Sequence, residues 1–135
     1  MKHNPRFVVV DDDPLNNALC HVIIKTTIAE ADIKTFTIPE KVLEYIASEY
    51  SRNGNEAILL LDLNMPTMSA WEFLEEFEKF DEKVKNRLKI YILSSSVDPR
   101  DIERASADKN VFDYIVKPLT SEIVNTISLG NKLTL

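Results

Sequence analysis

Four short segments of the chain place acidic, hydroxyl or ammonium side chains at the ends of apolar runs. They are the acidic segment Asp11-Asp12-Asp13, Asp62, Ser94 and the segment Lys117-Pro118. Carboxylates that gather in one place repel each other unless a cation joins them, and oxygen ligands suit a hard divalent ion such as Mg²⁺ or Mn²⁺. The same ion would neutralise an incoming phosphoryl group, while the ammonium and the hydroxyl hold its remaining oxygens. With one carboxylate as the nucleophile, this set predicts Mg²⁺-dependent phosphoryl transfer to an aspartate.

These groups act together only if the fold brings them together. Short β-rich apolar runs alternate with helical patterns, which is typical of a parallel sheet with helices on both faces. We expect five strands and five helices in strict βα order, and therefore a doubly wound, three-layer α/β/α fold. Ligands bind beyond the carboxyl ends of the strands in such sheets, which is where the four segments lie. The predicted strands are Arg6–Val10, Ile33–Thr37, Ala57–Leu63, Leu88–Leu93 and Val111–Val116.

Helix starts are marked by residues that cap free backbone N–H groups. Asp13 precedes Pro14 and suits the N-cap of the first helix. Two capping boxes are expected, one formed by Thr37 with Glu40 and one by Ser69 with Glu72. The segment 81–87 is rich in charge and is predicted to be a loop.

Two helices differ in the apolar faces that their sequences predict. The first has a long stripe at helical spacing, which predicts that this stripe is buried; its members are Leu15, Ala18, Leu19, Val22, Ile23 and Thr26. The helix that begins at Asp98 and Pro99 has only Ile102 and Ala105 as core candidates. We therefore expect this second helix to move at low energetic cost.

The length, charge and cysteine content of the chain limit its domain number and its possible partners. The chain has 135 residues, which fits one domain over 1–135, and a net charge of −6. This acidity argues against nucleic acid and against an anionic membrane surface. The first residues lack the plan of a signal peptide, so the expected compartment is the cytoplasm. The single cysteine, Cys20, allows neither an internal disulfide nor a metal cluster, and is expected to be a half-buried helix residue.

Taken singly, each motif has an ordinary structural explanation as a helix cap, a turn or a polar strand end. Together they resemble the motifs of bacterial response-regulator receiver domains, over about residues 5–130. The resemblance rests on the segments VVVDDDP (8–14), LDLNMP (61–66), ILSSS (92–96) and YIVKP (114–118). It implies a flavodoxin-like sheet with strand order 2-1-3-4-5.

The resemblance also implies a role for each site residue. Asp62 corresponds to the phosphoacceptor, Lys117 to the phosphate-binding lysine, and Ser94 and Tyr114 to the switch pair. The implied metal ligands are Asp12, Asp62 and the backbone carbonyl of Asn64, with Asp11 acting through a bound water. Lys117-Pro118 would be a cis peptide bond, and Asp13 the helix cap. The implied ion is Mg²⁺, with Mn²⁺ possible and Ca²⁺ able to substitute in a crystal.

The partners implied are a histidine kinase or phosphotransfer protein that donates the phosphoryl group, and a separate target protein. The target would bind the face formed by the fourth helix of the predicted set, strand five and the last helix. We expect a monomer or weak dimer.

The chain departs from the family pattern at Ala70 and Asn110, where glycine is usual. Asn tolerates the left-handed backbone better than most residues, so position 110 is expected to be sound.

Two other functions fit part of the pattern. Asp11 and Asp13 resemble the start of a haloacid-dehalogenase-type phosphatase, in which Asp11 would be the nucleophile. Pro14 and the lack of a role for Asp62 weigh against it. A phosphorylation-independent interaction module with the same fold is the second alternative, although receivers of that kind usually lack the acidic pair, the acceptor aspartate or the lysine. The expected function is therefore a phosphoacceptor signalling domain rather than an enzyme.

Overall fold

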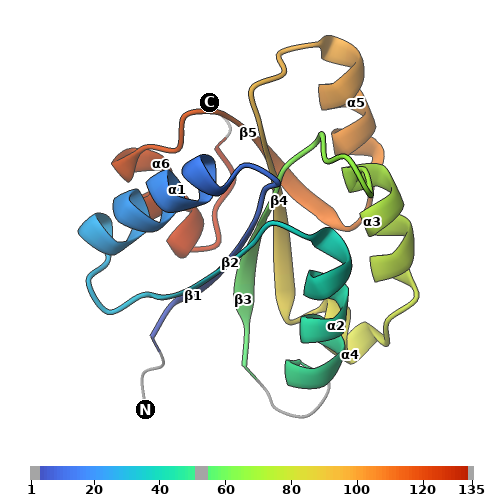
Figure 1. Cartoon of the computed structure of the whole chain (residues 1–135), viewed down its shortest axis with the longest axis horizontal. Helices are drawn as coiled ribbons and strands as arrows, with labels where there is room; N and C mark the ends of the chain where they lie inside the picture. Colours follow the sequence, from blue (N-terminus) through green and yellow to red (C-terminus); the bar gives the residue numbers. More distant parts are fainter. Residues whose placement is uncertain (1–3, 51–54, 134–135) are drawn as a thin grey trace.

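The computed structural model describes residues 4–50 and 55–133, and Figure 1 shows that a central sheet organises them. Its five strands are all parallel and lie in the order β2-β1-β3-β4-β5, as predicted. Their bounds are Arg6–Val10 (β1), Asp32–Phe36 (β2), Ala57–Leu61 (β3), Leu88–Ser94 (β4) and Val111–Val116 (β5). The helices are Pro14–Thr27 (α1), Pro39–Glu49 (α2), Ala70–Glu78 (α3), Glu82–Lys85 (α4), Pro99–Ala107 (α5) and Ser121–Ser128 (α6).

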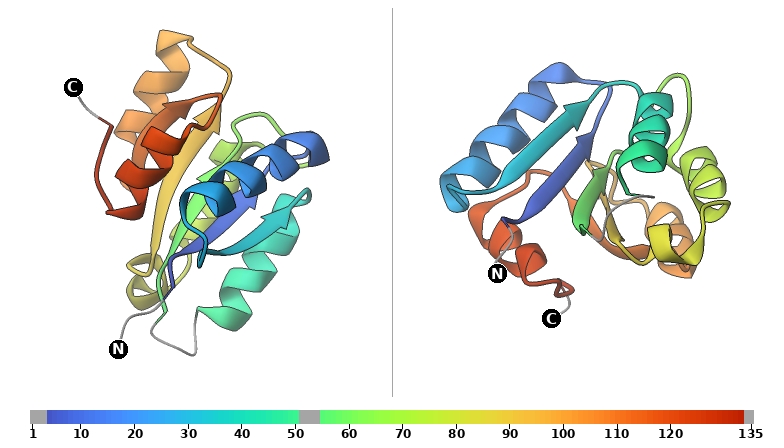
Figure 2. Two further views of the ribbon diagram at one scale, coloured as in Figure 1. Left: turned by 90° about the vertical axis from the view of Figure 1, so that its left-hand side faces the viewer. Right: turned by 90° about the horizontal axis from the view of Figure 1, so that it is seen from below.

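Helices cover both faces of the sheet, which makes the three-layer fold that the alternation predicts. Helices α1 and α6 lie on one face, and α2, α3 and α5 on the other (Figures 1 and 2). Each face has its own apolar cluster, the larger one under α2 and α3. The central strand β3 contributes Leu59 and Leu61 to one cluster and Leu60 to the other, because successive side chains point to opposite faces.

The prediction of five helices is wrong, because the segment 81–87 contains the short helix α4. Its one apolar residue, Val84, is buried in the larger core cluster. Lys85 forms ion pairs with Glu78 and Glu82, which satisfies much of the charge around this turn. A single apolar side chain among charged neighbours leaves no helical periodicity for a sequence pattern to detect.

The prediction that the α1 stripe is buried is wrong for all of its members except Ile23, which is partly buried against the core. Leu15, Leu19 and Val22 are 60–65% exposed, and the buried residues are Asn17, Cys20 and Ile24. The Asn17 side-chain amide donates to the backbone carbonyls of Asp11 and Phe36, both at 3.0 Å. These two bonds fix the rotation of α1, since they require position 17 to face the sheet. Cys20 follows inward and is fully rather than half-buried, and burial raises the pKa of its thiol to about 11.

Helix α5 has even less apolar contact with the core than its sequence predicts. Ala105 is buried, but Ile102 is exposed. The helix is tied to its surroundings by polar contacts instead. Arg104 lies 4.5 Å from the ring centre of the half-buried Trp71 on α3, and the Ser96 hydroxyl donates to Asp101 at 2.7 Å. Polar contacts of this kind rearrange at lower cost than packed apolar surface.

Of the two predicted capping boxes, only one is formed. Ser69 and Glu72 satisfy each other's backbone N–H groups at the start of α3. Helix α2 begins instead after Ile38 without a side-chain cap. Glu40 accepts a hydrogen bond from the hydroxyl of Thr67, so its carboxylate does not reach back to Thr37.

This difference predicts different responses to the same type of substitution. Ser69→Ala should lower the free energy of unfolding by about 1 kcal/mol, because an N-cap and its reciprocal bond are lost. Thr37→Ala should change it by less than about 0.5 kcal/mol. Urea unfolding of both variants measures the two effects. Equal losses would show that Thr37 also stabilises its helix.

Candidate functional site

The carboxyl ends of the three central strands bring the site residues together. Val10 of β1 is in register with Leu61 of β3, so the residues that follow them, Asp11 and Asp62, leave the sheet side by side. The backbone N–H of Asp62 donates to the Val10 carbonyl at 2.9 Å, which extends the pairing to the acid itself. On the other side of β3, the Lys117 N–H donates to the carbonyl of Ser94 at 2.8 Å.

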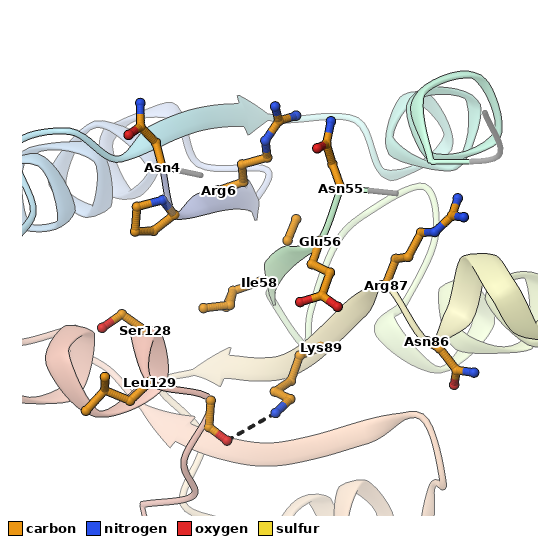
Figure 3. A pocket seen from close by; sticks show the side chains of 13 residues that line it. Asn4, Arg6, Asn55, Glu56, Ile58, Asn86, Arg87, Lys89, Ser128 and Leu129 are labelled. Carbon is orange, nitrogen blue, oxygen red and sulfur yellow. Dashed lines mark hydrogen bonds between the residues drawn. The ribbon is translucent and has the colours of Figure 1, made fainter. Parts of the chain in front are cut away.

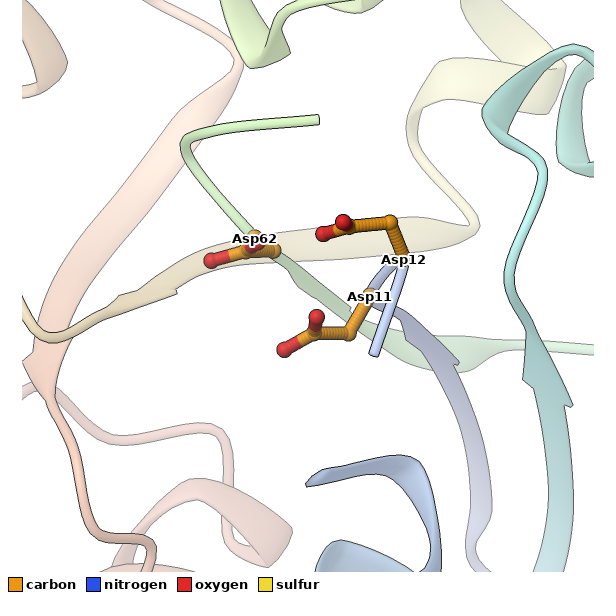
Figure 4. A group of neighbouring side chains, drawn as sticks. All are labelled: Asp11, Asp12 and Asp62. Atoms are coloured by element: carbon orange, nitrogen blue, oxygen red, sulfur yellow. The ribbon is translucent and has the colours of Figure 1, made fainter. Parts of the chain in front are cut away.

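Three carboxylates converge at this edge of the sheet (Figure 4). One carboxylate oxygen from each of Asp11, Asp12 and Asp62 lies within 4.8 Å of the others. Asp11 is 2% and Asp62 8% exposed, whereas Asp12 is an exposed residue. The cluster therefore has two buried acids behind one that faces solvent.

Lys117 supplies the positive charge that this cluster needs. Its Nζ lies 2.8 Å from Oδ2 of Asp11 and 3.4 Å from Oδ1 of Asp62. Burial lowers the pKa of the ammonium, but the bond to Asp11 and the charge of Asp62 outweigh this effect and raise it above its usual value. Lys117 is therefore a permanent cation between the two buried acids, bound more closely to Asp11 than to Asp62.

Ser94 at the end of β4 and Tyr114 on β5 both form hydrogen bonds with Ser96, in the loop after β4. Ser94 is buried, and its Oγ accepts from the N–H of Ser96 at 3.0 Å. The Tyr114 hydroxyl donates to the carbonyl of the same Ser96 at 2.9 Å. Because the Ser96 hydroxyl also donates to Asp101, this residue joins the two predicted switch residues to α5.

The comparisons with known proteins agree with this geometry. The family model of the response regulator receiver domain matches residues 7–128. The chain belongs to the response regulator receiver family. No curated relative matches it at a significant level.

Solved structures of receivers share the fold over nearly the whole chain. A two-component response regulator from Cytophaga hutchinsonii is 29% identical, with a TM-score of 0.82 over 96% of this chain and 99% of that one. A response regulator receiver protein from Dyadobacter fermentans is 24% identical, with a TM-score of 0.83 over 90% and 93%. A chemotaxis protein from Vibrio cholerae is 18% identical, with a TM-score of 0.74 over 95% and 98%. The last two show the fold alone.

The positions at which this receiver departs from its family are accommodated locally. Ala70 is fully buried as the first residue of α3, and its N–H donates to the Leu63 carbonyl at 3.2 Å. Asn110 does not adopt the left-handed backbone considered for it. Its N–H donates to Asp108 and its side-chain amide to Glu78. The Lys117–Pro118 bond is cis, as the resemblance implied.

The donor set of the acidic edge fits the divalent ion that the family implies. Its side-chain ligands are carboxylate oxygens, which favour Mg²⁺ or Mn²⁺ over a softer metal. The two oxygens of Asp11 already accept three donors, namely the Asp13 N–H, the Asn16 amide and Lys117. Asp12 is exposed and has no such set of donors among the described contacts. An ion would therefore meet Asp12 and Asp62 more directly than Asp11.

Asn16, Asn17 and Ser96 belong to this site, although the sequence pattern did not single them out. Asn16 donates to Asp11 Oδ2 at 2.6 Å, and Asn17 ties the Asp11 carbonyl to the end of β2. Two asparagines in the first turn after an N-cap are common in helices, so their types alone indicate no function. The sequence did contain one indication. Asn17, Cys20 and Ile24 have the spacing of one helix face, and the predicted stripe contains none of these three residues.

A cavity of about 740 Å³ lies at the opposite edge of the sheet, near the amino ends of β1 and β3 (Figure 3). Its lining mixes Arg6, Glu56, Arg87 and Lys89 with apolar groups. The Lys89 ammonium donates to the Gly130 carbonyl at the end of α6, and so serves the fold. The converging acids lie at the carboxyl edge instead, where doubly wound sheets bind their ligands.

The electrostatics of the site predict a pH-dependent stability. Burial, followed by the charge of Asp11, raises the pKa of Asp62 from 3.8 to about 6. Ionised Asp62 is therefore less favourable in the folded than in the unfolded chain, and stability falls as pH rises from about 4 to about 6. In EDTA, Asp62→Asn should stabilise the protein by about 1–3 kcal/mol at about pH 7.5, and hardly at all near pH 4.

Urea unfolding at the two pH values measures this difference. Asp12→Asn is the matched control, because Asp12 is exposed and its charge is the smallest contribution to the shift. Its stabilisation should be the smaller one. A gain in Asp62→Asn that is the same at both pH values would contradict the assigned cause.

Proposed function

We propose that this receiver takes a phosphoryl group on Asp62 from the phosphohistidine of a kinase or phosphotransfer protein, and that it acts in the cytoplasm as a monomer or weak dimer. The observation that carries the proposal is the meeting of Asp62 with Asp11, Asp12 and Lys117 at the carboxyl edge of the sheet. A pKa of about 6 leaves Asp62 ionised at neutral pH, as a nucleophile must be.

The transfer follows from what these side chains do. A carboxylate oxygen of Asp62 attacks phosphorus, the new O–P bond forms, and the N–P bond to the donor histidine breaks with its electron pair left on the imidazole. Lys117 and the Ser94 hydroxyl hold two of the phosphoryl oxygens. A divalent ion, when bound, lowers the charge on the transferring group. Lys117 lies closer to Asp11 than to Asp62, at 2.8 Å against 3.4 Å, and in this proposal it shifts from Asp11 towards the phosphoryl group on Asp62.

We assign the ion's ligands to Asp12, Asp62 and the backbone carbonyl of Asn64, with Asp11 acting through water. The full set of donors on Asp11 supports its indirect role. Asn64 is an exposed residue two positions after Asp62. Mg²⁺ is the expected ion, and Mn²⁺ offers the same preference for oxygen ligands.

The output surface that we propose is the face formed by α5, β5 and α6. The hydrogen bonds of Ser96 to Ser94, Tyr114 and Asp101 give a route from the phosphoryl site to α5. Ile102 of α5 and Val116 of β5 are exposed, as is Val97 just before α5, and a target protein would cover them. The acidic net charge supports a protein target rather than nucleic acid.

The donor protein has to approach the acidic edge, and α1 begins there. Leu15, Leu19 and Val22 form an exposed apolar stripe that starts two residues after Asp13. Apolar stripes on helices are surfaces for other proteins. We therefore assign the stripe to the phosphodonor. It lies on α1, which packs beside α6 at one border of the output surface.

Asp62→Asn tests the main proposal. Incubation with radiolabelled acetyl phosphate and Mg²⁺ should label the wild-type protein in an acid-labile, hydroxylamine-sensitive form, as expected of an acyl phosphate. The variant should lose the label while it stays folded by circular dichroism. Omission of Mg²⁺ should lower the wild-type labelling by at least about tenfold. Label retained in the variant, or mapped to Asp11, would favour the phosphatase alternative. No labelling and no ion binding in the wild type would favour the interaction module.

Leu19→Glu tests the donor surface. Because Leu19 lies on the stripe and away from the acids, labelling by acetyl phosphate should stay within about twofold of wild type. Transfer from the phosphorylated partner kinase should fall by at least about tenfold. The substitution places a charge where the bound kinase would cover an apolar side chain. Ile102→Glu is the matched control on the output surface and should leave transfer unchanged. Equal transfer to the Leu19 variant would exclude α1 from the donor interface.

A further inference from the structure

Asn16 and Lys117 share one acceptor atom. The Asn16 amide lies 2.6 Å and the Lys117 ammonium 2.8 Å from Oδ2 of Asp11. The other oxygen of Asp11 accepts from the Asp13 N–H at 2.9 Å. Two donors on the same oxygen divide its charge between them, so each binds it less strongly than it would alone.

Asn16 is not needed to begin the helix. The N-cap of α1 is Asp13, whose side chain accepts from the N–H of Leu15. Asn17, the next residue, has its own bonds to the carbonyls of Asp11 and Phe36 and fixes the first turn of α1. The start of α1 thus holds Asn16 in place, and its side-chain amide is directed back to the Asp11 carboxylate.

We propose that Asn16 is a positioning residue that frees Lys117 for the phosphoryl group. The proposal rests on the function proposed above, in which Lys117 leaves Asp11 to bind a phosphoryl oxygen at Asp62. Asp11 is buried, so the departure of Lys117 alone would leave a desolvated carboxylate short of donors. The Asn16 amide stays on Oδ2 and compensates for that loss. Asn16 therefore favours the phosphoryl-bound position of Lys117 and has little effect on the ion, whose direct ligands lie elsewhere.

The test compares the affinities for Mg²⁺ and for beryllofluoride, which stands in for the phosphoryl group. Asn16→Leu keeps the size of the side chain but removes the donor. Calorimetric titration should show a Mg²⁺ dissociation constant within about twofold of wild type, and a beryllofluoride affinity about tenfold weaker at saturating Mg²⁺. Asn125→Leu is the matched control, an exposed asparagine on α6, and should leave both constants unchanged.

A double-mutant cycle with Lys117→Ala separates positioning from general damage. If Asn16 acts through Lys117, Asn16→Leu should weaken beryllofluoride binding by less than about twofold in the Lys117→Ala background. Asn16→Gln, which keeps the amide, should recover part of the affinity in the otherwise wild-type protein.

Three results would overturn the role of Asn16: additive effects of the two substitutions, a parallel fall in Mg²⁺ and beryllofluoride affinity, or no change in either constant. Failure of the proposed function looks different, because the wild-type protein would then bind no beryllofluoride in the presence of Mg²⁺.

Discussion

The structure depends on a like-charge contact that the strand order makes unavoidable. With β1 beside β3 at the centre of a parallel sheet, the residues after both strands leave the same edge side by side. Both of these residues are aspartates, and both are buried. Two carboxylates this close are unfavourable in a medium of low dielectric unless a cation lies between them. Lys117 is that cation, and it reaches the acids because it follows β5, whose carboxyl end lies at the same edge of the parallel sheet.

The hydrogen-bond donors at this edge are divided unequally between Asp11 and Asp62. Lys117 is nearer to Asp11 than to Asp62, and Asp11 has two further donors while Asp62 has none among the described side-chain contacts besides Lys117. The protein thus stabilises one acid at the expense of the other. Asp62 keeps a raised pKa and few hydrogen-bond donors, which suits the nucleophilic role that we propose for it. The free energy lost there is offset by the apolar clusters on both faces of the sheet.

Sequence patterns predicted the strands well, because each strand is a short β-rich run followed by a polar residue of distinct type. The strand order came from the family resemblance instead. The same strand-end pattern selected Asp62, Ser94 and Lys117 as candidates, and the structure brings Asp62 and Lys117 together. Sequence patterns failed where one polar contact overrides a periodic pattern. Nothing in the sequence near Thr37 indicates that Glu40 bonds to Thr67, a residue 27 positions away. The isolated Val84 likewise has no periodic neighbours to mark α4 as a helix.

The error on α1 shows how the site shapes the rest of the helix. Leu15, Leu19 and Val22 have the spacing of a core stripe, and rotation of the helix could bury them. The rotation is set instead by Asn17, whose amide joins the ends of β1 and β2, with its Oδ1 left unpartnered among the described residues. An asparagine in the core is unfavourable unless its bonds are worth more than the apolar burial it displaces. Here those bonds hold the loop that carries Asp11 and Asp12, and the displaced leucines remain on the surface beside it. Precise placement of the acids and an exposed apolar stripe next to them are therefore two consequences of the same residue.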